Sequence, residues 1–164
     1  LNTVNRFQHS IVKKIQGFRY QTRSDMAESM LGLYRLSSAI EKQKLLFLHK
    51  ILTLPVHCIT KEIFLRKYYL YLSCKSLVSR GFIPDICSLL SKYKLSTIVN
   101  TFIADPHSLP QKHTWKNIVN NAIAINETAL WDQRLAADED FTFFRILHPV
   151  MKPCIVYKTI EKSS

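Results

Sequence analysis

Glycine and proline are scarce in this sequence, with 3 Gly and 6 Pro among 164 residues. Such a composition disfavours loop-rich β folds and excludes the glycine-rich loops that cradle phosphates. No apolar run approaches the ~18 residues that a membrane-spanning helix needs. The hydrophobic share is 47% and the mean hydropathy is −0.03, which excludes a membrane-embedded protein and a disordered tail. We therefore expect one globular domain, or at most two small ones, with a hydrophobic core.

Motifs of the common catalytic sites are also missing. The sequence contains no GxSxG, HExxH, GxxxxGK[S/T] or CxxC pattern. Three histidines adjoin or lie near proline turns, where a surface or capping role is commoner than that of a general base: His57, His107 and His148. We therefore expect no catalytic residue in this chain.

Metal ligands are present only in unusual spacings. Cys58 beside His57, or His107 with His113, match no common zinc site. The acidic run 138–140 could hold a metal, but acids that precede a helix are favoured by the helix dipole alone. We therefore expect no metal and no cofactor in this chain.

The four cysteines, Cys58, Cys74, Cys87 and Cys154, form no close pair. The sequence shows no apolar secretion leader, which favours reduced thiols and an intracellular protein. The chain begins with Leu1 rather than Met, which indicates a piece of something longer.

Positive charge is the strongest signal. The chain has 23 Lys and Arg against 12 Asp and Glu, a net charge of +11, and a pI near 9.6. Residues 1–50 contribute +6, residues 51–100 contribute +5, and residues 101–164 are neutral. Such clustering favours a polyanion-binding face, with basic but merely solvated helix faces as the alternative. We predict a basic nucleic-acid-facing region over 1–104, a hinge over 105–113 (DPHSLPQKH) and a neutral packing region over 114–164.

Hydrophobic periodicity predicts an all-α irregular bundle of about seven helices, with a short strand or extended tail over 154–157. Stop signals are Gly17, Gly32 and Pro55, and Pro84 suits a helix start. The expected helix-capping side chains are Thr22 or Ser24, Ser38 with Glu41 as a capping box, Thr60 and Thr114.

Apolar stripes predict which helix faces are buried. The first helix has Val4, Phe7, Ile11, Ile15 and Phe18 within an arc of about 80°. The longest helix has Trp115, Ile118, Val119, Ala122, Ile125 and Ala129 on its stripe, with Trp131 outside it. We also expect Phe64, Tyr68 and Tyr69 to lie in the core.

Basic residues beside these stripes are the candidate binding site. Lys67, Tyr71 and Lys75 are spaced i, i+4, i+8, so two cations and an aromatic share one helix face. Cations at that spacing neutralise phosphates, and tyrosine stacks on a base or sugar. Arg6 and Lys13 lie opposite the apolar stripe of the first helix, and Arg19 and Arg23 continue that basic surface through the turn.

Several short motifs carry a family resemblance along residues 4–157. They are RFQ at 6–8, KIQGF at 14–18, TRSDM at 22–26, LGL at 31–33, IExxKLxF at 40–47, GFIPD at 81–85, WK at 115–116, WxxRL at 131–135 and FRxLHP at 144–149. In this order they resemble the region that follows the reverse transcriptase domain in invertebrate non-LTR (LINE-like) retrotransposon proteins. These motifs are structural rather than catalytic.

The resemblance implies a longer parent protein with an endonuclease and an RNA-directed DNA polymerase that uses Mg. Polymerases of that family hold metal through paired aspartates, and this sequence has no adjacent Asp-Asp and no Cys/His knuckle. No catalytic residue carries over. The chain would be a helical thumb-like or post-thumb part.

Two functions follow as hypotheses. In the first, the chain binds template, primer or target RNA and/or DNA through phosphates, in the nucleus and cytoplasm and without a membrane. In the second, its apolar helix faces dock on the upstream polymerase domain of the same polyprotein, without nucleic-acid contact. A relic fragment with no independent activity is a further alternative.

Overall fold

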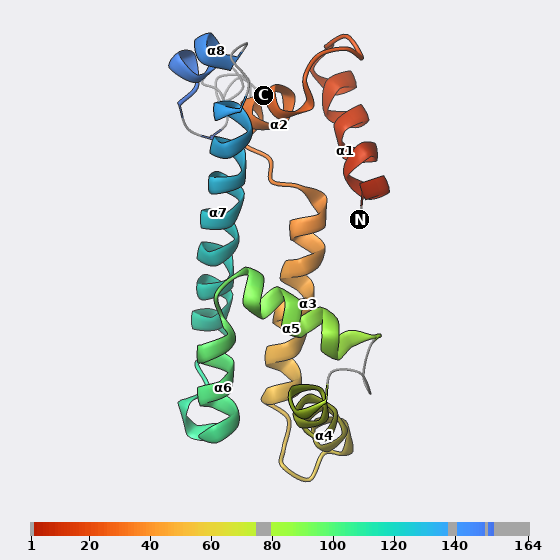
Figure 1. Ribbon diagram of the computed structural model, residues 1–164, viewed down its shortest axis with the longest axis vertical. Coiled ribbons are helices and arrows are strands. Elements are labelled where there is room, and N and C mark those ends of the chain that lie inside the picture. The colour runs from red at the N-terminus through yellow and green to blue at the C-terminus, as the bar shows by residue number, and fades with distance from the viewer. Residues whose placement is uncertain (1, 75–79, 138–140, 150, 153–164) are drawn as a thin grey trace, which may run out of the picture. The chain divides into compact units, whose positions relative to one another are not determined.

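The computed structural model describes residues 2–74, 80–137, 141–149 and 151–152. All regular structure in these residues is helical, which confirms the predicted all-α multi-helix fold. The α-helices are α1 (Asn2–Ile15), α2 (Ser24–Met30), α3 (Leu36–Leu52), α4 (Ile59–Ser73), α5 (Phe82–Lys92), α6 (Ser96–Ala104), α7 (Lys112–Ala136) and α8 (Thr142–Leu147), and a 3-10 helix η2 (Pro106–Ser108) precedes α7 (Figure 1). The strand or tail expected over 154–157 lies outside the described residues.

Length and hydropathy of the helices also bear on the membrane question. Among the described helices, none joins the length to the apolar character that a membrane crossing requires.

The chain forms two compact units. Unit 1 comprises residues 1–40 and 124–164, so it is built from both ends of the sequence, and unit 2 comprises residues 41–123. The boundaries fall inside α3 and α7. The hinge expected over 105–113 lies within unit 2, and the division into a basic and a neutral functional region stays a prediction.

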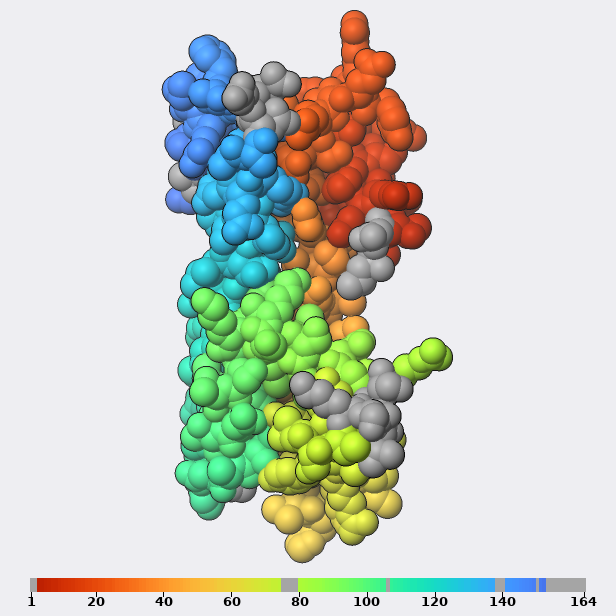
Figure 2. Space-filling view, in the orientation of Figure 1, coloured from red at the N-terminus to blue at the C-terminus, as the bar shows by residue number. Residues whose placement is uncertain are grey.

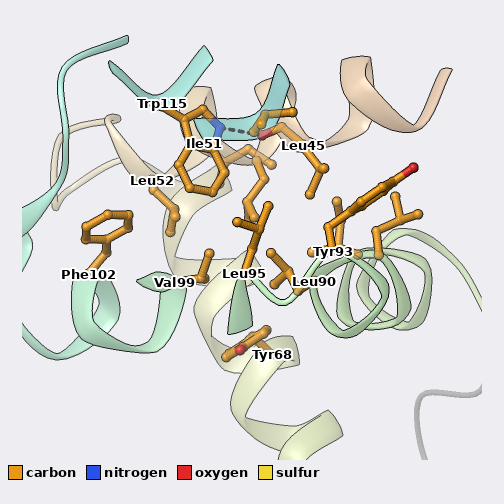
Figure 3. Packing of buried hydrophobic residues seen from close by; sticks show 14 of the residues in the cluster. Leu45, Ile51, Leu52, Tyr68, Leu90, Tyr93, Leu95, Val99, Phe102 and Trp115 are labelled. Atoms are coloured by element: carbon orange, nitrogen blue, oxygen red, sulfur yellow. Dashed lines mark hydrogen bonds between the residues drawn. The ribbon is translucent and has the colours of Figure 1, made fainter. Parts of the chain in front are cut away.

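Unit 2 has one continuous apolar core. Leu45 and Leu48 of α3, Leu90 of α5, Val99 of α6 and Trp115 of α7 are all fully buried. Figure 3 shows the side chains of these helices converging on a common interior, where Trp115 Nε1 donates a 3.0 Å hydrogen bond to the Leu45 carbonyl. In the space-filling view the side chains of α5 and α6 meet over this unit without a break (Figure 2). Burial of apolar surface therefore holds unit 2 together.

Unit 1 has a small apolar core and an unusual share of buried polar groups. The apolar cluster consists of Trp131, Leu135, Phe141 and Met151. The buried polar residues are Glu28, Ser29, Ser37, Ser38 and Glu127. Ser38 is hydrogen-bonded to Glu127, whereas Glu28 Oε1 and Glu127 Oε2 have no hydrogen-bond partner among the described residues. Such a buried polar atom without a partner costs free energy.

Three helices end in the same backbone motif. After α1 and α2, Gly17 and Gly32 adopt positive φ angles of 67° and 63°, as the predicted stops require. After α5, Lys94 takes this left-handed conformation with a φ of 57°. In each case the next amide reaches back to close the last turn, as in the 2.8 Å bond from the Leu95 amide to the Leu90 carbonyl. Lys94 is therefore a strained substitute for glycine.

The predicted helix caps are wrong. α2 has Arg23 as its N-cap and α4 has Cys58, each without a capping side-chain bond, so Thr22, Ser24 and Thr60 do not cap. α7 begins before Thr114.

The capping box at the start of α3 is also wrong, because this helix begins at Leu36. Ser38 donates instead to buried Glu127, and Glu41 accepts from Lys92 and Tyr93. Both side chains thus bond to residues that are distant in the sequence and do not cap the helix.

The predicted buried face of α1 is wrong. Phe7 and Ile15 are 65% and 72% exposed, and Ile11 is also exposed. The face of α1 that packs against the rest of unit 1 has Val12 as its one buried apolar residue. Its polar side chains form hydrogen bonds to the rest of the unit. The cause is that the neighbouring segment 27–37 offers two backbone carbonyls, two backbone amides and a serine hydroxyl to this face.

Two further packing predictions need correction. In α7 the buried residues recur every fourth position, as Trp115, Val119, Ile123, Glu127, Trp131 and Leu135. Trp131 therefore belongs to this series, whereas Ile125 is exposed. In α4, Phe64 and Tyr68 are buried as expected, but Tyr69 is exposed and meets Tyr68 edge-to-face.

Candidate nucleic-acid interface

The positive charge is distributed unevenly between the two units. Residues 41–123 contain twelve Lys and Arg against four acids, which gives +8, and the rest of the chain contains eleven against eight, which gives +3. Most of the surplus charge therefore belongs to unit 2.

Three of the four acids of unit 2 are already neutralised. Glu41 lies 2.6 Å from Lys92, Asp85 lies 2.7 Å from Lys44, and Glu62 pairs with Arg66 one turn away in α4. The fourth, Asp105, accepts the backbone amide of His107 at the start of η2. Within the described part of unit 2, the remaining cations have no acidic partner: Lys42, Lys50, Lys61, Lys67, Arg80, Lys94, Lys112 and Lys116. Charges left unpaired in this way attract polyanions.

A groove of about 700 Å³ opens on unit 2 beside α3 and the start of α7. We call it the α3–α7 groove. Most of its lining area is apolar, and the described residues that line it include no acid: Gln43, Leu46, Phe47, His49, Lys50, Thr53, Leu109, Pro110, Gln111, Lys112, Trp115 and Lys116. Three lysines therefore surround an apolar floor.

The walls of the α3–α7 groove are tied together by buried contacts. His49 of α3 makes a 2.8 Å hydrogen bond between its Nε2 and the Pro110 carbonyl, so this nitrogen carries the proton. The His49 ring also stacks on Trp115, with 6.0 Å between the ring centroids. α3 is thus fixed to the segment that leads into α7.

The structure describes two of the three residues of the stripe predicted on α4, and their binding role stays a prediction. Lys67 is exposed and has no hydrogen bond or ion pair to any described residue. Tyr71 is half-buried and packs against the core of unit 2. Lys75 lies outside the described residues.

Tyr71 also lines a second, more polar groove. This groove has a volume of about 550 Å³ and includes Ser88, Ser91 and Asn100. Lys92 lies there too, but its ammonium is already paired with Glu41. Because Lys92 is the one cation among the described residues that line it and is engaged, this groove is less suited to phosphate than the α3–α7 groove.

The four residues of unit 1 that are candidates for phosphate binding differ in their contacts with other residues. Arg6 and Arg19 are exposed. Lys13 donates a 3.0 Å bond to the Tyr20 carbonyl and lies 5.5 Å from the Tyr20 ring centroid. The Arg23 guanidinium lies 4.7 Å from the centre of the Phe141 ring. Arg6, Arg19 and Arg23 are thus exposed at the surface of this unit, and Lys13 is half-buried.

A buried ionisable cluster lies between α1 and α2 in the same unit. His9 Nε2 lies 3.1 Å from Glu28 Oε1, yet the geometry makes no hydrogen bond, so Oε1 has no donor among the described residues. Burial, reinforced by the negative charge of Asp25, raises the pKa of Glu28 to about 7. Burial also lowers the pKa of His9. Near pH 7 Glu28 is therefore only partly ionised, and the lowered pKa of His9 favours its neutral form, which favours a role in packing.

The remaining candidates concern metal binding. No group of three or more His, Cys, Asp or Glu side chains in the described ranges is arranged to hold a metal. His57 and His107 are exposed, and His148 Nε2 lies 3.0 Å from the Ser29 carbonyl. The acidic run 138–140 lies outside the described residues.

Sequence reasoning missed the lysines of the α3–α7 groove. Lys112 and Lys116 lie in the third of the chain whose charges sum to zero, because that sum also includes Asp132 and the acidic run 138–140. Their i, i+4 spacing at the start of the longest helix was the available signal, and Lys50 joins them only through tertiary packing.

Comparisons with known proteins identify no relative: no protein-family model, no curated protein and no solved structure matches this chain.

Proposed function

We propose that this chain is a non-catalytic, helical nucleic-acid-binding part of a non-LTR retrotransposon reverse transcriptase, thumb-like or post-thumb in position. It binds template, primer or target strands largely through their phosphates. The family assignment rests on the ordered motifs of the sequence. The binding function is supported by one observation above all: most of the described cations of unit 2 have no acidic partner among the described residues, whereas its few acids are engaged.

Phosphate binding of this kind has a measurable consequence. Each neutralised phosphate releases counterions, so the affinity falls as salt rises. About four phosphate contacts on duplex DNA predict a slope near −3.6 for log K against log salt, or about a hundredfold weaker binding at 200 mM than at 50 mM salt.

A fluorescence anisotropy titration with duplex, RNA–DNA hybrid and single-stranded probes tests this proposal. The charge reversal Lys67→Glu should weaken binding to all three probes. Affinity that stays flat between low and moderate salt would rule the proposal out.

The alternative function is docking on the polymerase domain of the same polyprotein. The exposed stripe Phe7, Ile11 and Ile15 on α1 favours it, because an amphipathic helix that turns its apolar side outward leaves that side available to a partner. The double variant Phe7→Ser, Ile15→Ser should abolish association with the polymerase domain and leave nucleic-acid affinity unchanged. Lys67→Glu should have the opposite pattern, so the two functions are separable.

A further inference from the structure

The floor of the α3–α7 groove presents an aromatic ring that is only half covered. Phe47 lines the groove and is 49% exposed. Phe82 of α5 supports it in an edge-to-face contact, with 5.5 Å between the ring centroids. This contact supports the Phe47 ring, and the hydrogen bond between His49 and Pro110 joins the groove walls, so both are formed before any ligand arrives.

The rim of the same groove is cationic. Lys50 extends from α3, and Lys112 and Lys116 lie one turn apart at the start of α7. The first-turn amides of α7 add positive partial charge at this end of the groove. A ligand that contacts both the lysines of the rim and Phe47 of the floor must carry several negative charges and a flat apolar surface.

We infer that the α3–α7 groove binds a single-stranded segment of nucleic acid, with one unstacked base against Phe47 and the adjoining phosphates on Lys50, Lys112 and Lys116. Each nucleotide of a single strand supplies both an anion and an open ring face, whereas a duplex hides the ring faces in its base stack. This inference rests on the proposed function and narrows it, because phosphate contact alone does not require an exposed base.

A direct comparison of two probes tests the inference on the full chain. The probes are a labelled oligothymidylate of about 12 nucleotides and a duplex of the same length, titrated by fluorescence anisotropy. Phe47→Leu keeps an apolar side chain but removes the stacking ring, so we expect about tenfold weaker binding of the single strand and unchanged binding of the duplex. Phe7→Leu, at an exposed phenylalanine of unit 1, is the matched control and should change neither affinity.

The rim is tested by replacing Lys50, Lys112 and Lys116 with Gln. Loss of three phosphate contacts should reduce the salt slope for the single strand by about 2, since each contact contributes about 0.7. The control variant replaces Lys67, Arg80 and Lys94 of the same unit with Gln, and it should reduce the salt slope for the single strand less.

Ultraviolet crosslinking of a bromodeoxyuridine-substituted probe should label peptides that contain residues 47–50 or 109–116. Equal melting temperatures of variants and parent exclude misfolding as the cause.

The outcomes separate this inference from the proposed function. If Phe47→Leu weakens neither probe or both equally, the inference is overturned while salt-sensitive binding stands. If the parent chain binds no probe, both fail. If an acidic amphipathic peptide displaces the oligothymidylate and its own binding depends on Phe47, the groove is a protein-docking site and the inference is also overturned.

Discussion

Units 1 and 2 are stabilised by different means. Unit 2 buries a continuous apolar core, and its buried glutamate, Glu41, is ion-paired with Lys92. Unit 1 buries two glutamates, and it holds α1 through polar side chains with Val12 as the one buried apolar residue of that helix. Apolar packing depends little on pH, whereas burial raises the pKa of Glu28 in unit 1 to about 7, so that this carboxyl changes its charge near neutral pH. The stability of unit 1 should therefore respond to pH more than that of unit 2.

The largest expected effect is a loss of stability on replacing a core residue of unit 2. Leu48 is 0% exposed in the core, so Leu48→Ala should lower the free energy of unfolding by about 2–5 kcal/mol through lost burial and a residual cavity. Leu70→Ala, at a side chain that is 43% exposed in α4, is the matched control and should cost less than about 1 kcal/mol. Urea denaturation measures both, and equal losses would contradict the assigned core.

The second prediction concerns pH and unit 1. Burial raises the pKa of Glu28 from 4.5 to about 7, so the folded state holds this proton more tightly than the unfolded chain. Below pH 4.5 Glu28 is protonated in both the folded and the unfolded state, so it does not lower the free energy of unfolding there. Between pH 4.5 and 7 the unfolded chain ionises first, and stability falls by about 3 kcal/mol, because each pKa unit corresponds to about 1.36 kcal/mol. The lowered pKa of His9 opposes this trend, since it costs stability as pH falls below 6.5.

Replacement of Glu28 isolates its contribution. Glu28→Gln should stabilise the protein at pH 8, by up to about 3 kcal/mol, and have little effect at pH 4. The measurement is the free energy of unfolding of parent and variant across this pH range. Glu62→Gln in unit 2 is the control, because its exposed pair with Arg66 should be worth under about 1 kcal/mol. A pH-independent difference between Glu28→Gln and the parent would refute the role of burial.

The third prediction tests which side of α1 faces the protein. Gln8 donates a 2.9 Å bond to the Tyr34 carbonyl and accepts a 2.5 Å bond from the Leu36 amide. Gln8→Ala should cost about 1–2 kcal/mol, because two hydrogen bonds are lost. Phe7→Ala should cost less than about 0.5 kcal/mol, because this side chain is exposed. Hydrogen exchange of the α1 amides and the free energy of unfolding measure both, and the reverse ranking would place the apolar stripe inside.

The smallest effect concerns a backbone position of unit 2. Lys94 has a φ of 57°, where a side chain other than that of glycine costs about 1 kcal/mol. Lys94→Gly should therefore stabilise the protein by about this amount in thermal unfolding. The same replacement at Lys67, inside α4, should instead destabilise it by about 1 kcal/mol. A loss of stability in both variants would argue against strain at Lys94.

Local signals in the sequence predicted the helices and several of their ends. Gly17 and Gly32 end α1 and α2 because glycine adopts positive φ angles at little cost, and this preference does not depend on distant residues. The predictions of which side chains cap the helices were wrong. Ser38 and Glu41 have the spacing of a capping box, but each bonds to a distant residue.

The candidate site shows the same division. Exposed Lys67 and Arg6 followed from helical spacing and charge alone. Lys50 and Lys112 are separated by more than sixty positions in the sequence, and only the packing of α3 beside the start of α7 makes them neighbours.

The sequence by itself determined that this protein is helical and basic, since both properties follow from residue type and short-range periodicity. Only the tertiary structure decided that α1 turns its apolar stripe outward, that the surplus charge belongs mainly to unit 2, and that three lysines surround one apolar groove. The physical reason is that a helix can satisfy its own backbone locally, whereas the partner of a side chain depends on which distant surfaces fold against it.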